Sequence, residues 1–101
     1  GILGSSRAAR REAMRQQGIP TSQQPVAQGN TPGGRYYEYE IPRPGGGRDR
    51  AVVIEHEDER HGPHWEAGIK KPETTDQWGR PRHFNRDPIT QRPKSRVPFR
   101  R

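Results

Sequence analysis

Three segments in the middle of the chain predict β-strands: apolar and polar residues alternate along the first and third, and the second is a β-branched run. The segments are residues 35–41, 51–56 and 64–70, and the glycine-rich residues 42–50 between the first two predict a hairpin turn. Successive side chains of a strand point to opposite faces of the sheet. In the first strand Tyr37, Tyr39 and Ile41 share one face, and Tyr36, Glu38 and Glu40 share the other. In the second strand the two groups are Val52, Ile54 and His56, and Val53 and Glu55; in the third they are Trp65, Ala67 and Ile69, and His64, Glu66 and Gly68.

A different pattern precedes the strands and predicts a helix over residues 6–17. Most of these residues are adequate helix formers, and Ser5 or Ser6 can cap the start. Gly18 suits the left-handed position that follows a last helical turn, and Pro20 prevents continuation. The apolar stripe is thin. The other face is therefore either solvated or contacts phosphate through its four arginines: Arg7, Arg10, Arg11 and Arg15.

These elements fit a single domain, because 101 residues are too few for two independent cores. We predict an α+β fold in which the helix packs against a small antiparallel sheet formed by residues 35–70. Residues 20–34 are expected to be a loop, and residues 71–101 an extended, irregular basic arm. The predicted core consists of Tyr37, Tyr39, Val53, Ile54, Trp65, Ile69, Trp78 and Phe84.

The composition is polar and basic for a folded domain. Only 25% of the residues are hydrophobic, 12 are glycine, 11 are proline, and the net charge is +7. So few apolar groups compensate poorly for the chain entropy lost on folding, and we expect a bound partner to contribute to order. The charge favours an acidic partner, either nucleic acid or an acidic protein, over a merely solvated cationic surface.

Some classes of site and segment are excluded by what the sequence lacks. It has no cysteine, which excludes disulfides, thiolate zinc sites and cysteine nucleophiles. The longest apolar run, AVVI, is too short to span a membrane. The first residues, GILGSS, contain neither an initiator methionine nor a signal peptide, so we expect the chain to be the end of a longer protein.

The stretch EHEDERHGPHWEAG, residues 55–68, gathers three of the four histidines with five carboxylates. Imidazole can accept or donate a proton near neutral pH, and RNA cleavage by the 2′-hydroxyl needs both steps, together with cations around the phosphate. No metal or cofactor is required. We predict that His61 and His64 exchange the proton and that His56 or Glu66 assists. Phosphate would be held by Lys70, Lys71, Arg80 and Arg82.

The same residues allow two other interpretations. Histidine with aspartate or glutamate can hold a divalent cation on a scissile phosphate, as in HNH-type nucleases. Those nucleases place a helix after the β-hairpin, whereas Pro72, Pro81 and Pro88 interrupt the segment that would form it. Alternatively, the histidines are ordinary polar loop residues in a chain that only binds RNA, the ribosome or an acidic protein.

Four motifs in order resemble a known family. SSRAARREAMRQQGIPTSQQP (residues 5–25) is followed by RYYEYEI, AVVIEH and HGPHW. Over residues 5–69 the chain resembles the C-terminal domains of bacterial polymorphic toxins of the Rhs, contact-dependent and LXG types. That family is usually described as an HNH or endonuclease-VII-like nuclease, and its signature positions match His56, His61 and His64.

The resemblance implies a nuclease toxin that is released from a large carrier and acts in the cytoplasm of a neighbouring bacterium. It also implies an acidic immunity protein that protects the producer. Combined with the chemistry of the histidines, it leads us to predict a metal-independent ribonuclease toxin, with tRNA as one candidate target. The alternatives are a metal-dependent DNase that uses the same histidines, and a non-catalytic RNA-, ribosome- or protein-binding module.

Overall fold

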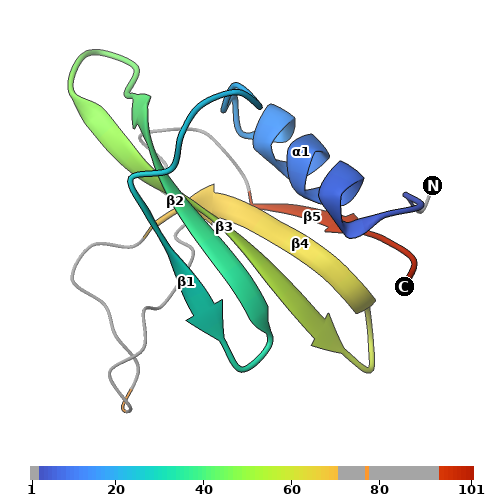
Figure 1. The fold of residues 1–101 in the computed structure, drawn as a ribbon. Coiled ribbons are helices and arrows are strands. Elements are labelled where there is room, and N and C mark those ends of the chain that lie inside the picture. The colour runs from blue at the N-terminus through green and yellow to red at the C-terminus, as the bar shows by residue number, and fades with distance from the viewer. Residues whose placement is uncertain (1–2, 71–76, 78–93) are drawn as a thin grey trace.

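The computed structural model describes residues 3–70, 77 and 94–101, which form one helix and a five-stranded antiparallel sheet (Figure 1). The strand order in the sheet is β1-β2-β3-β4-β5, so each strand pairs with its neighbour in the sequence. This arrangement confirms the predicted α+β fold. The elements are α1 (Ser6–Gln16), β1 (Ala27–Thr31), β2 (Gly34–Pro42), β3 (Arg48–Asp58), β4 (Gly62–Ile69) and β5 (Ser95–Pro98).

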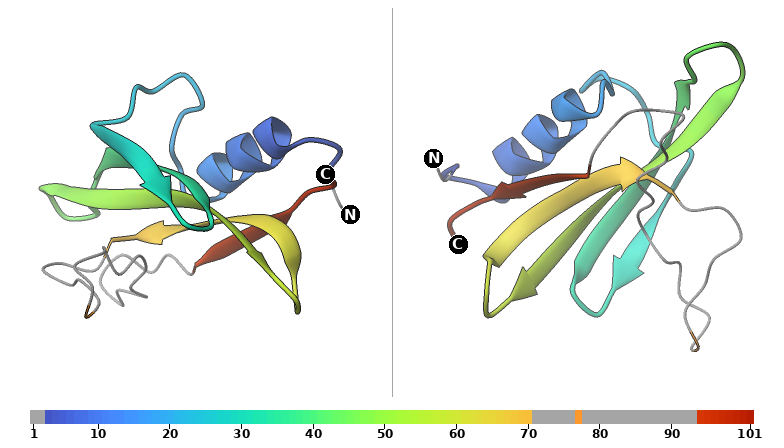
Figure 2. Two further views of the ribbon diagram at one scale, coloured as in Figure 1. Left: turned by 60° about the horizontal axis from the view of Figure 1, so that its bottom comes forward. Right: turned by 180° about the vertical axis from the view of Figure 1, so that it is seen from behind.

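The helix lies on one face of the sheet, above β4 and β5 (Figure 2). It begins as expected from the sequence, because the Ser5 side chain accepts a hydrogen bond from the Ala8 N–H at 3.1 Å. It ends at Gly18, whose φ of 72° lets the Ile19 N–H donate to the Met14 carbonyl at 2.9 Å. No helix within the described residues is long and apolar enough to cross a membrane.

The hydrophobic core fills the space between α1 and the sheet. Trp65 is its largest member, with no exposed surface, and the indole Nε1–H donates to Ser6 Oγ at 2.9 Å, which ties β4 to the first turn of the helix. Leu3 and Tyr37 pack against the edge of this core. Its buried members are Ala9, Ala13, Met14, Ile19, Tyr39, Ile41, Ala51, Val53, Trp65, Ala67, Ile69, Val97 and Phe99.

The predicted core residues divide between the two faces of the sheet. Tyr39, Val53, Trp65 and Ile69 belong to the core beneath α1. Ile54 is equally buried, but it pairs with Tyr36 and Glu66 across the neighbouring strands and faces away from the helix. The other predicted members, Trp78 and Phe84, lie outside the described residues.

Two segments that were expected to be irregular contain strands. Residues 27–31, within the predicted loop, form β1 because they pair with β2 from Ala27↔Glu38 to Thr31↔Gly34. Residues 95–98, within the predicted irregular arm, form β5 because they pair with β4. Neither segment has the β-branched alternation of an autonomous strand, so both owe their conformation to a neighbouring strand.

Candidate functional site

The hairpin of β3 and β4 places three histidines on the sheet face opposite α1. His56 lies directly across from His64 in the antiparallel register, and the turn that joins the strands carries His61. Since side chains alternate along a strand, His64 points away from the helix while its neighbour Trp65 points into the core. The local sequence therefore fixes which face of the sheet carries the imidazoles.

The three imidazole rings lie next to one another, with His64 in the middle. The ring centroids of His56 and His64 are 6.0 Å apart and the rings are stacked. The ring of His61 meets His64 edge to face, with 5.6 Å between centroids. The structure thus brings together the three histidines that the sequence grouped.

His64 is the most enclosed member of this histidine cluster, with 0% of its surface exposed. Its Nδ1 lies 2.8 Å from the carbonyl oxygen of Gly62, which can only accept a hydrogen bond, so Nδ1 carries a proton. Its Nε2 lies 3.2 Å from Oε1 of Glu66. Glu66 therefore faces the second ring nitrogen of His64 beneath the surface.

Glu66 is the acceptor that holds the cluster together. Lys94 Nζ lies 2.8 Å from Oε2 and Arg96 Nε lies 3.7 Å from Oε1, and both cations come from the β5 side of the sheet. Burial alone would raise the pKa of Glu66, but the hydrogen bond and charge of Lys94, and then the hydrogen bond of His64, lower it below the ordinary value. Glu66 is therefore ionised near neutral pH.

His61 is held in place by hydrogen bonds to Asp58. Asp58 Oδ1 accepts from the His61 backbone N–H at 2.6 Å and lies 3.1 Å from its Nδ1. These two bonds also lower the pKa of Asp58. A carboxylate on Nδ1 fixes the orientation of the ring and leaves Nε2 as the nitrogen that can exchange a proton with substrate. The His61 side chain keeps 28% of its surface exposed, unlike His64.

His56 lies in a half-buried position at the other end of the cluster. Burial lowers its pKa below the ordinary value for histidine; the charge of Glu66 opposes this shift, while His64 and Lys94 add to it. His56 is consequently neutral near pH 7. The three imidazoles thus have three different environments: His56 is half-buried and neutral, His64 is buried against Glu66, and His61 is partly exposed beside Asp58.

The cations near the histidines differ from those predicted. Lys70 lies six residues from His64, roughly 20 Å along the strand, and its Nζ contacts Glu38 at 3.1 Å, so it does not join the cluster. The other three predicted phosphate ligands lie outside the described residues: Lys71, Arg80 and Arg82. The cations that do lie beside the histidine cluster are Lys94 and Arg96, which both contact Glu66.

Two features of the sequence signal the residues that the prediction missed. In KSRV, buried Ser95 and Val97 alternate with Lys94 and Arg96, which is the period of a strand, but only four residues show it between two prolines. Asp58 precedes His61 by three residues, a spacing that suits a side chain capping a tight turn. Both patterns cover only a few residues, and neither predicts a structure until the strand that pairs with it is known.

Within residues 3–70, 77 and 94–101, no three histidine, aspartate or glutamate side chains are arranged to hold a metal ion. No protein-family model, curated protein or solved structure matches the chain. The groups available for chemistry are neutral His56, His61 beside the Asp58 carboxylate, and the cations Lys94 and Arg96.

Proposed function

We propose that this chain is the ribonuclease domain of an antibacterial toxin, and that it cleaves RNA by general acid–base catalysis without a metal. The observation that supports this function is the contact of His56 and His61 with the same buried ring, His64, beside two cations on β5. A pair of titratable groups in contrasting environments is the usual arrangement of a catalytic base and acid.

In this mechanism His56 is the general base. Its lowered pKa keeps it neutral near pH 7, so it can take the proton from the ribose 2′-hydroxyl. The activated oxygen then attacks the neighbouring phosphorus. RNA is favoured over DNA because it carries this nucleophile itself, and a proton-transfer pair is then sufficient.

His61 is the general acid, since its Nε2 can deliver a proton to the departing 5′-oxygen. Asp58 compensates the positive charge that the ring carries before the transfer. His64 is a positioning residue rather than a catalytic one, because its surface is fully buried and both of its ring nitrogens are engaged. This assignment changes the sequence-based expectation that His64 itself exchanges the proton.

Lys94, just before β5, and Arg96, within it, would bind the scissile phosphate. Both cations face one carboxylate, Glu66. The Arg96 side chain keeps 44% of its surface exposed and can turn toward a ligand. Positive groups near the phosphate oxygens stabilise the charge that develops in the transition state.

The family resemblance supplies the biological setting of this proposal. Residues 5–69 resemble polymorphic toxin C-terminal domains, which are delivered into neighbouring bacteria and act in the cytoplasm. An immunity protein with an acidic surface would neutralise such a toxin by covering the cationic face around Arg96. The net charge of +7 is consistent with both an RNA substrate and such an inhibitor.

The direct test incubates the purified chain with total RNA and, separately, with plasmid DNA, each with and without excess EDTA. We expect RNA to be cleaved at the same rate in both conditions, leaving 2′,3′-cyclic phosphate ends, and the plasmid to stay intact. Cleavage of the plasmid that EDTA abolishes would instead indicate the metal-dependent DNase. Binding of RNA that weakens steeply with salt, with no cut strands, would indicate a non-catalytic binding protein.

A second test uses the pH dependence of kcat/KM on RNA. Protonation removes the base, so activity should fall as the pH drops through the pKa of His56, which lies below 6.5. In His56→Gln this acidic limb should disappear together with most of the activity, whereas Glu59→Ala, an exposed change in the same hairpin, should keep the wild-type profile. An unchanged acidic limb in His56→Gln would assign the base to another residue.

A further inference from the structure

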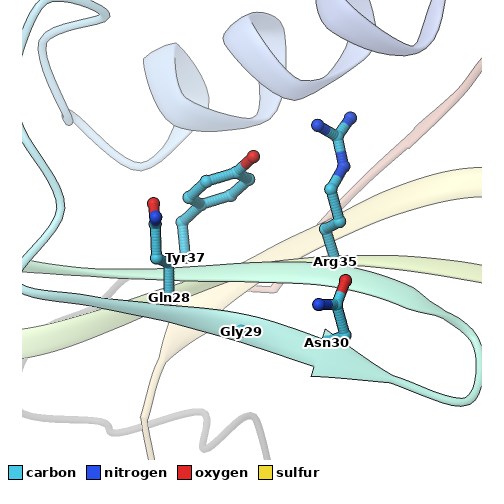
Figure 3. A pocket seen from close by; sticks show the side chains of 5 residues that line it. All are labelled: Gln28, Gly29, Asn30, Arg35 and Tyr37. Carbon is cyan, nitrogen blue, oxygen red and sulfur yellow. The ribbon is translucent and has the colours of Figure 1, made fainter.

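A second feature lies on the other face of the sheet, at the edge that β1 forms among the described strands. A pocket of about 320 Å³ on the β1–β2 hairpin is lined by the residues labelled in Figure 3: Gln28, Gly29, Asn30, Arg35 and Tyr37. Its volume is at the lower end of the range for small-ligand sites, roughly 300–1,000 Å³. The pocket is separate from the histidine cluster, whose side chains point to the opposite face.

The polar groups of this pocket come from two cross-strand pairs. Gln28 lies opposite Tyr37 and Asn30 lies opposite Arg35, so all four side chains project to the same face, as Figure 3 shows. The two amides are two residues apart, about 7 Å along the strand. Each amide presents a donor beside an acceptor, which is the pattern that pairs with the edge of a nucleobase, adenine above all.

The β2 side of the pocket is rigid and cationic. The Tyr37 ring stacks on Trp65 with 6.2 Å between centroids, and the Arg10 guanidinium lies 4.9 Å from the Tyr37 centroid. The Arg35 guanidinium lies 6.0 Å from the Trp65 ring centroid, and it forms no ion pair within the described residues. The Arg35 side chain is exposed, and a guanidinium suits a phosphate group because its donors match the phosphate oxygens.

We infer that this pocket binds one unpaired nucleotide of the RNA substrate, with the amides of Gln28 and Asn30 reading the base and Arg35 binding its phosphate. The inference rests on the proposed function and adds a specificity site to it. An exposed surface that combines two base-reading amides, an arginine and an aromatic wall recognises single-stranded RNA better than a duplex, whose base edges are less accessible.

The β1–β2 turn connects this nucleotide pocket with the histidine cluster. Asn30 and Arg35 flank the turn, and Gly33 at its tip lies against β3: a Cβ built on Gly33 would be 3.5 Å from the Glu55 carbonyl oxygen and 3.7 Å from His56 Nδ1. An RNA strand that crosses this turn therefore reaches the proposed base from the pocket. The pocket would select a nucleotide near the cleaved bond but not adjacent to it.

The test measures binding and cleavage separately. AMP, GMP, CMP, UMP and inorganic phosphate are titrated into the 15N-labelled chain, and the side-chain amide signals of Gln28 and Asn30 are followed by NMR. We expect AMP to bind most tightly and to shift both amides, and Asn30→Ala to weaken AMP binding about tenfold. Gln24→Ala, which removes an exposed amide from the loop before β1, is the matched control and should bind as the wild type.

The cleavage arm compares a dinucleotide, which is too short to reach both sites, with an eight-nucleotide single strand. Asn30→Ala should raise KM about tenfold for the longer RNA, leave the dinucleotide rate unchanged, and weaken the preference for adenosine near the cut. Binding of AMP without any cleavage would refute the nuclease and retain the nucleotide site. The pocket assignment is overturned if phosphate binds as well as AMP, or if Asn30→Ala changes neither AMP affinity nor cleavage preference.

Discussion

Replacing His61 with alanine is expected to reduce RNA cleavage about 10²- to 10⁴-fold while the fold stays intact, because the variant loses a positioned proton donor. His61 sits in a turn, keeps 28% of its side chain exposed, and is hydrogen-bonded to an exposed carboxylate, so few packing contacts depend on it. The loss should appear in kcat, measured in single-turnover reactions on a defined RNA. Growth arrest of cells that express the variant should disappear in parallel.

Two companion variants separate proton transfer from turn structure. Asp58→Asn keeps an oxygen that can accept from the His61 backbone N–H but removes the negative charge from Nδ1, so it should retain the turn and lose part of the activity. Glu59→Ala changes the neighbouring turn position and should behave as the wild type. If His61→Ala cleaves RNA at the wild-type rate with unchanged pH dependence, His61 is not the acid and the mechanism proposed for this site is wrong.

The second large effect is structural: Glu66→Ala is expected to lower the free energy of unfolding by about 2–4 kcal/mol, because it leaves Nε2 of fully buried His64 without its partner and removes the carboxylate that Lys94 and Arg96 share. Glu66 is 8% exposed, and it is the partner of fully buried His64 as well as of Lys94 and Arg96. For a domain of this size the midpoint of thermal unfolding should fall by roughly 10–25 °C. Chemical denaturation followed by circular dichroism measures the change.

The control for this variant is Glu57→Ala, which removes the same charge from the adjacent strand. Glu57 is exposed and pairs with Arg101 at 2.9 Å, an interaction worth at most about 1 kcal/mol at a protein surface. Glu66→Gln tests the charge alone, since it keeps an oxygen near His64, and should fall between the two alanine variants. Equal stability of Glu66→Ala and Glu57→Ala would contradict the central position of Glu66.

The same carboxylate makes stability depend on pH. Because the pKa of folded Glu66 lies below its unfolded value, its contribution is fully present above about pH 4.5 and is lost as the pH falls through the folded pKa. His56, whose pKa is also lowered, adds a loss that begins at about pH 6.5. Denaturation midpoints measured from pH 7 to pH 3 should therefore fall in two stages. Glu66→Ala should reduce the lower stage, to which Asp58, whose pKa is also lowered, contributes as well.

Much of the sheet could be predicted because its central strands carry their own pattern. In β2 and β4 apolar residues recur at every second position, β3 carries the β-branched run AVVI, and burial of one face beneath α1 penalises a shift of register. The helix likewise carries its boundaries in Ser5 and Gly18. β1 could not be predicted in this way, because AQGNT has almost no apolar side chains and its order comes from pairing with β2.

The candidate site follows the same division. The local sequence is enough to gather His56, His61 and His64 on one β-hairpin, since strand alternation and a short turn leave them few other arrangements. The groups around them depend on tertiary contacts. β5 returns from far along the chain and brings Lys94 and Arg96 against Glu66, while His64 is buried and His61 stays partly exposed. Burial and charge compensation depend on contacts between segments distant in sequence, and no local pattern specifies those contacts.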